Sequence, residues 1–98
     1  MKEKYDKFEI ETAIFEATGL PICEIHKKTL KSEYTLARKA LYYLLFKNGY
    51  RRIDISRMYG ISPSAAIHSR REIEKRIIHD RELKRIVMAA EIFLEQEL

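Results

Sequence analysis

Apolar residues recur along most of this chain at the three- and four-residue spacing of an α-helix. The first such segment predicts a helix over about residues 6–18. The sequence Gly-Leu-Pro then ends it, because glycine accepts the helix-ending conformation and proline cannot continue the hydrogen bonding. A second short helical turn is predicted over 22–25, and residues 26–33 are predicted to form a basic loop. The apolar positions of the first helix are Ile10, Ala13, Ile14 and Ala17.

The longest apolar segment predicts a central helix that is the most buried of the chain and ends near Asn48 and Gly49. A last helix, capped by Asp80, is predicted over the C-terminal part. Because no segment alternates apolar and polar residues as a strand does, we predict an all-α fold, a compact bundle of about six helices in a single domain over residues 1–98. The apolar rows are Leu36, Ala37, Ala40, Leu41, Leu44 and Leu45 in the central helix, and Leu83, Ile86, Val87, Ala90 and Leu94 in the last one.

Residues 51–78 between these helices predict a helix, a three-residue turn and a second helix. Gly60 would end the first helix, since glycine reaches positive φ without strain. Ile61 would fill the angle between the helices, Ser62 would be the N-cap, and Pro63 suits the first position of the second helix. The core-facing positions would be Ile55, Met58, Tyr59, Ala66, Ile73 and Ile77.

This layout is typical of a DNA-binding helix-turn-helix, in which the N-terminal residues of the second helix meet base edges. Short side chains at its start would let that helix approach the major groove closely, and residues one turn further along suit bases or phosphates. Arg51 and Arg52 open the first helix at the end where the helix dipole disfavours cations, and a phosphate would relieve that cost. The candidate contacts of the second helix are Ser62, Ser64, Ala65, His68, Ser69 and Arg71.

The charge of the chain is segregated. The net charge is only +4, but residues 21–60 hold nine Lys and Arg against three Asp and Glu, and residues 61–78 hold four against two. The first and last twenty residues are each acidic, with three basic residues against five acidic ones. A basic middle between acidic ends favours a polyanionic partner such as nucleic acid.

Several classes of function lack support in the sequence. Cys23 is the single cysteine, which excludes an internal disulfide and is predicted to be a small core residue. His26, His68 and His79 do not have metal-ligand spacing, so we expect no metal site. No catalytic Ser/His/Asp or Cys/His arrangement is present, so we expect no enzyme, no cofactor and no small-molecule substrate. No apolar run approaches the roughly 18 residues of a membrane span, which predicts a cytoplasmic protein without membrane contact.

The stretch TLARKALYYLLFKNGYRRIDISRMYGISPSAAIHSRREIEKRI, residues 35–77, resembles the C-terminal DNA-binding domain of the bacterial replication initiator DnaA, one of the Trp-repressor-like helix-turn-helix folds. Weaker similarity covers residues 10–25, the following basic loop, and DRELKRIV at 80–87, so that nearly the whole chain takes part. The matching features are Ala37-Arg38, an Ile-containing first motif helix, Ile67-His68, Arg71 and Ile73.

The resemblance implies a bacterial, nucleoid-associated protein of replication or transcription. It implies that Arg38 and a basic loop with Lys27, Lys28 and Lys31 serve the minor groove and flanking phosphates, while the turn and second motif helix serve the major groove. The family typically has Gly-Gly-Arg/Lys-Asp-His-Thr/Ser-Thr/Ser at the turn, and the Asp-His-Thr group reads bases. This chain has Gly-Ile-Ser-Pro-Ser-Ala at 60–65 instead, and it lacks the GxxxxGK[ST] motif of an initiator ATPase.

Three functions follow as hypotheses. The first is binding of double-stranded DNA, by a single copy, a homodimer or a larger parent complex. The second is a protein-interaction adaptor that keeps the helix-turn-helix scaffold without sequence-specific DNA reading. The third is single-stranded nucleic acid or RNA binding through aromatic residues. The clustering of these aromatics around the central helix instead favours packing at the core or its rim; they are Tyr42, Tyr43, Phe46, Tyr50 and Tyr59.

Overall fold

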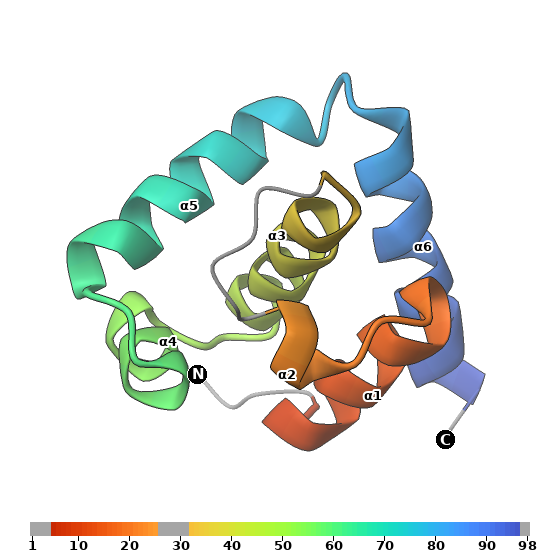
Figure 1. Cartoon of the computed structure of the whole chain (residues 1–98), viewed down its shortest axis with the longest axis horizontal. Helices are drawn as coiled ribbons and strands as arrows, with labels where there is room; N and C mark the ends of the chain where they lie inside the picture. The colour runs from red at the N-terminus through yellow and green to blue at the C-terminus, as the bar shows by residue number, and fades with distance from the viewer. Residues whose placement is uncertain (1–4, 26–31, 97–98) are drawn as a thin grey trace.

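The computed structural model of the protein describes residues 5–25 and 32–96, and these form six helices without a strand (Figure 1). The all-α fold expected from the sequence is therefore confirmed. The helices are α1 (Lys7–Thr18), α2 (Ile22–Ile25), α3 (Ser32–Lys47), α4 (Arg52–Tyr59), α5 (Pro63–Arg76) and α6 (Arg81–Gln96). No helix in these ranges has both the length and the apolar character needed to cross a membrane.

Helix α3 occupies the middle of the bundle, and the other helices pack around it (Figure 1). Its apolar rows are buried as predicted, except that Leu36 is only half-buried. Every one of the five neighbouring helices contributes at least one buried residue to the same core. Burial of this apolar surface is what holds the bundle together. The buried residues of α3 are Ala37, Ala40, Leu41, Tyr42, Leu44 and Leu45.

Local capping signals fix where the helices begin and end. Asp6 and Glu9 form a capping box at the start of α1, with each side chain accepting a hydrogen bond from the other residue's backbone N–H at 2.8 and 3.0 Å. Gly19 ends α1 with a φ of 73°. At the start of α6, the backbone N–H of Leu83 donates to Asp80 Oδ1 at 3.0 Å, which confirms the predicted cap.

Two sequence-based expectations are wrong. Cys23 is exposed and not part of the core. The reason is helical spacing, because Ile22 and Ile25 lie three residues apart and pack inward, while Cys23 points away from them. The predicted loop over 26–33 also ends too late, since Ser32 and Glu33 belong to α3. An acidic residue in the first turn suits the positive end of the helix dipole, which favours this earlier start.

The bundle brings the two acidic ends of the sequence together. Helices α1 and α6 pack against each other on one side of α3, and α4 and α5 pack against each other on the other side (Figure 1). Segments 5–20 and 79–96 carry eight acidic residues against four basic ones, whereas residues 51–76 carry seven basic residues against three acidic ones. The segregation seen along the chain therefore becomes a difference between two sides of the molecule.

Candidate nucleic-acid interface

The turn between α4 and α5 has the geometry expected from its residues. Gly60 has a φ of 68°, and its N–H donates to the carbonyl of Ser56 at 2.9 Å. The Ser56 hydroxyl donates to the carbonyl of Ile61, whose side chain packs against the core. Ser62 Oγ accepts the N–H of Ala65 at 3.1 Å. The turn is thus closed by its own hydrogen bonds and does not need a partner to hold it.

The tip of the α4–α5 pair is open to solvent. Residues 62–65 are all exposed, and Ser64 and Ala65 face outward in the first turn of α5. No acidic residue occurs between Asp54 and Glu72 in the sequence. The exposed helix start, with its positive dipole end and small side chains, is therefore compatible with close approach to an anionic surface.

A row of exposed side chains continues from this tip along α5. The row has the spacing i, i+4, i+7 and i+11, which places its members on one face of a helix. The opposite face carries Ala66 and Ile73, both buried against the bundle. We call this row the outward stripe; its members are Ser64, His68, Arg71 and Lys75.

The cations of the outward stripe have no acidic partner among residues 5–25 and 32–96. Neither Arg71 nor Lys75 forms an ion pair with any residue of the described ranges 5–25 and 32–96. Lys75 was not among the sequence candidates, although its spacing from Arg71 could have identified it. Ser69, which was a candidate, is half-buried and lies off the outward stripe.

Of the two acidic residues adjacent to the outward stripe in sequence, Glu72 and Glu74, Glu72 is compensated. Glu72 Oε1 lies 2.7 Å from Lys39 Nζ on α3 and 3.6 Å from Arg76 Nη1. The hydrogen bond from Lys39, together with the charge of Arg76, lowers the pKa of Glu72. The Lys39–Glu72 pair therefore ties α5 to α3 and reduces the repulsion that a bare carboxylate would exert on a phosphate.

Two arginines stand at the start of α4. The backbone N–H of Arg51 donates to Asp54 Oδ2 at 2.7 Å, and the Arg51 Nε lies 3.5 Å from the same oxygen. These contacts lower the pKa of Asp54, and the backbone hydrogen bond from Arg51 is the largest cause. Arg52 is exposed and forms no ion pair within the described part of the chain. Of the two, Arg52 has the more available positive charge.

The predicted minor-groove residues are placed differently. Arg38 is half-buried on α3, and its Nε donates to the carbonyl of Ile25 at 2.7 Å. This bond links α3 to the end of α2, so Arg38 has a structural role whether or not it meets DNA. Lys27, Lys28 and Lys31 lie outside the described residues.

Aromatic packing anchors the α4–α5 pair to the rest of the bundle. The Tyr59 hydroxyl donates to Glu11 Oε2 on α1 at 2.7 Å, and Lys7 Nζ lies 5.2 Å from the centre of the Tyr59 ring. Burial first, and the hydrogen bond to Glu11 second, raise the pKa of Tyr59 far above its ordinary value. The predicted role of the five aromatic residues in packing is confirmed, since all of them are buried or packed against the core.

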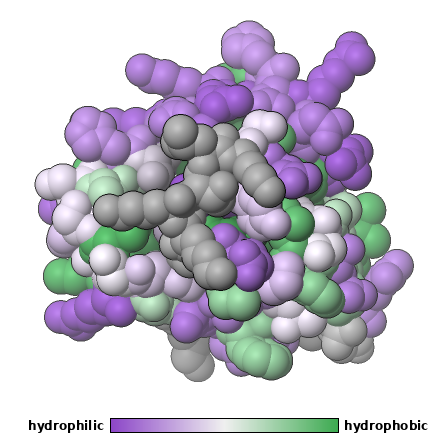
Figure 2. Space-filling view, viewed as in Figure 1, coloured by the Kyte–Doolittle hydropathy of each residue, from purple (hydrophilic) through white to green (hydrophobic). Residues whose placement is uncertain are grey.

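Hydrophilic side chains gather along the upper rim of Figure 2, where Figure 1 places the end of α5 and the α5–α6 turn. Hydrophobic atoms reach the surface at the lower, right and left sides of the same view. No family model, curated protein or solved structure matches this chain. Its function must therefore be inferred from the chemistry of these residues.

Proposed function

We propose that the protein binds double-stranded DNA through α4 and α5, with the start of α5 in the major groove. The observation that carries this proposal is the outward stripe, an exposed row with two uncompensated cations that begins at a small-residue helix tip. Helix α5 packs on the bundle through Ala66 and Ile73 on its opposite face, so the outward stripe stays accessible to solvent.

Each part of the surface suits a different part of a duplex. Ser64 can exchange hydrogen bonds with a base edge or a phosphate, and Ala65 can contact a thymine methyl group. Arg71 and Lys75, further along α5, suit phosphates on one side of the groove. Arg52 suits the backbone that the first helix of such a motif crosses.

The resemblance to the DnaA C-terminal domain supports the same docking mode. We accordingly propose a role on bacterial DNA, in replication or transcription. The missing Asp-His-Thr group favours a target other than the family's usual origin box, because the residues that would read that box are replaced by Ser, Pro and Ser at 62–64.

Selection of bound duplexes from a random DNA pool tests the proposal directly. Enrichment of a shared sequence is expected, and its absence at low salt would exclude specific reading. For about four phosphate contacts, affinity should decrease roughly 100-fold as monovalent salt rises from about 50 to 200 mM. A salt-independent affinity would contradict the proposed surface.

A charge-matched pair of double variants locates the surface. Arg71→Ala/Lys75→Ala should weaken binding to all sequences and reduce the salt slope by about 1.8, the value for two lost phosphate contacts. Arg81→Ala/Lys84→Ala removes two exposed cations from α6 and should leave the slope nearly unchanged. Equal losses in both variants would refute the outward stripe. Ser64→Ala, by contrast, should change the preference among sites more than the overall affinity.

Exposed apolar residues favour a second candidate function, contact with another protein. Phe8 on α1 is 75% exposed, and Met88 and Ile92 on α6 are 60% and 53% exposed. Such side chains on the α1–α6 side are compatible with an adaptor that binds through the face opposite α4 and α5. An adaptor without DNA reading would show neither duplex enrichment nor salt-dependent DNA affinity.

A further inference from the structure

A groove runs along the flank of α5, between the end of α3 and the start of α4. It consists of two hollows, of about 200 and about 500 Å³, which share Phe46, Lys47 and Arg70 in their walls. The larger hollow falls within the size range of small-molecule sites in proteins, about 300–1,000 Å³, and the smaller one lies below it. The groove lies beside the outward stripe, because Ile67, Arg70 and Glu74 lie on the flank of α5 between the stripe and the buried face.

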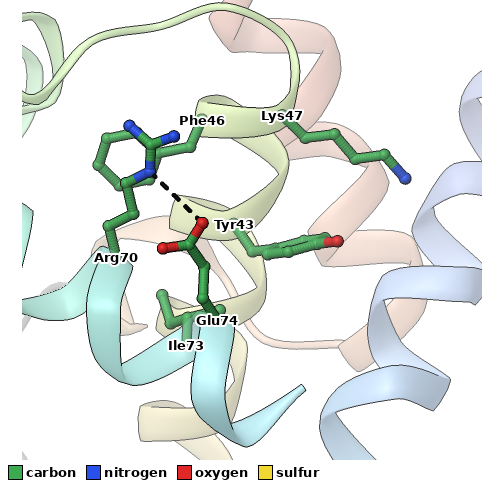
Figure 3. Close-up of a pocket in the computed structure, with 6 residues that line it drawn as sticks. All are labelled: Tyr43, Phe46, Lys47, Arg70, Ile73 and Glu74. Atoms are coloured by element: carbon green, nitrogen blue, oxygen red, sulfur yellow. Dashed lines mark ion pairs between the residues drawn. The ribbon is translucent and has the colours of Figure 1, made fainter. Parts of the chain in front are cut away.

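The smaller hollow is suited to a planar ring. Figure 3 shows the Tyr43 ring on one side and the Phe46 ring with the Arg70 guanidinium on the other. The guanidinium carbon lies 5.1 Å from the centre of the Phe46 ring, a cation–π contact that exposes flat surface. The Glu74 carboxylate stands between the two groups in this view and pairs only loosely with Arg70, at 3.8 Å. It can accept hydrogen bonds from N–H groups on a ring.

The larger hollow is suited to an anion. Arg51 and Arg52 line it at the positive end of α4, where Arg52 has no acidic partner in the described ranges. Lys47 is less available, because its Nζ lies 2.6 Å from Glu91 Oε2. Lys47 and Arg70 line both hollows, whereas Glu74 lines only the smaller one and Arg51 and Arg52 only the larger one. The larger hollow is therefore the more cationic of the two.

We propose that this groove binds a mononucleotide, with the base against the Tyr43 ring beside the Glu74 carboxylate and the phosphate at Arg52. An acidic peptide fits less well, because Glu74 would repel a carboxylate placed between the aromatic residues. The proposal goes beyond DNA binding by the outward stripe and does not depend on it.

Titration with adenosine 5′-monophosphate, followed by the amide and side-chain NMR signals of the full chain, tests this site. Saturable shifts of the groove residues are expected, with a Kd below about 1 mM. Adenosine and ribose 5-phosphate each lack one half of the ligand and should bind at least about tenfold more weakly. No saturation, equal binding of inorganic phosphate, or shifts caused only by a short acidic peptide would overturn the proposal.

Variants distinguish the groove from the outward stripe, although the groove shares Arg52 with the proposed DNA surface. Arg52→Gln should weaken binding of adenosine 5′-monophosphate but not of adenosine, whereas Glu74→Gln should weaken binding of both. Arg71→Ala, a change on the outward stripe, should leave nucleotide affinity unaltered. If Arg71→Ala lowers it as much as Arg52→Gln, the nucleotide is binding along the outward stripe and the groove site is refuted.

Discussion

Replacing Ile73 with alanine tests the central packing claim, that α5 is held in place by its buried face. Ile73 is 1% exposed and packs in the common core. The substitution removes three carbon atoms, which at about 0.8 kcal/mol per buried methylene corresponds to about 2.4 kcal/mol of lost transfer free energy. Incomplete collapse of the cavity adds to this, so we expect a total loss of about 3 kcal/mol in the free energy of unfolding.

Ile78 provides a matched control five residues away. It is 64% exposed, so Ile78→Ala should change the free energy of unfolding by less than about 0.5 kcal/mol. Urea unfolding, monitored by far-UV circular dichroism, gives the free energy of unfolding of both variants, provided that its dependence on urea concentration (the m value) is unchanged. The Ile73 variant should also melt about 10–20 °C lower, a large effect for a domain with a total stability of about 5–15 kcal/mol. If both variants unfold at the same urea concentration, α5 is not held by this side chain and the positioning of the outward stripe loses its basis.

Three further predictions concern the turn, a helix cap and the α2–α3 link. Gly60→Ala should lower the free energy of unfolding by about 1–2 kcal/mol, measured by urea unfolding. The added Cβ would meet no atom within 4 Å, so the loss comes only from the backbone φ of 68°, which an alanine adopts with strain. Gly60→Asn should lower it less, because asparagine adopts this conformation more readily. The hydrogen bond from the Leu83 N–H is the largest cause that lowers the pKa of Asp80. The ionised Asp80 side chain therefore stabilises the fold at pH values above its unfolded-state pKa, and this stabilisation is lost as the pH decreases through its folded-state pKa. Asp80→Asn should accordingly make the free energy of unfolding less dependent on pH below about pH 4. Arg38→Ala should lower the free energy of unfolding by about 1–3 kcal/mol, because the hydrogen bond to the Ile25 carbonyl is lost. The thermal midpoint should decrease accordingly. An unchanged midpoint would show that the bond contributes nothing.

The local signals of the sequence were sufficient for the helices themselves. Apolar spacing placed the buried faces, and capping residues such as Asp6, Gly60, Ser62 and Asp80 set the boundaries because their hydrogen bonds involve residues only three or four positions away. The errors arose where such signals were weak. Helix α2 has only four residues, too few for a pattern to decide which side Cys23 would face.

The tertiary structure decided how residues distant in the sequence combine. Arg38, which the resemblance assigns to DNA contact, also donates from its Nε to the Ile25 carbonyl once α2 folds against α3. The compensation of Glu72 by Lys39 depends in the same way on how α5 lies across α3. Helical period could have identified Lys75, which was not among the sequence candidates, but only the packed bundle shows that no acidic residue of the described ranges pairs with it. Secondary structure is fixed by short-range hydrogen bonding and apolar period, whereas the charge that a surface presents depends on contacts across the whole fold.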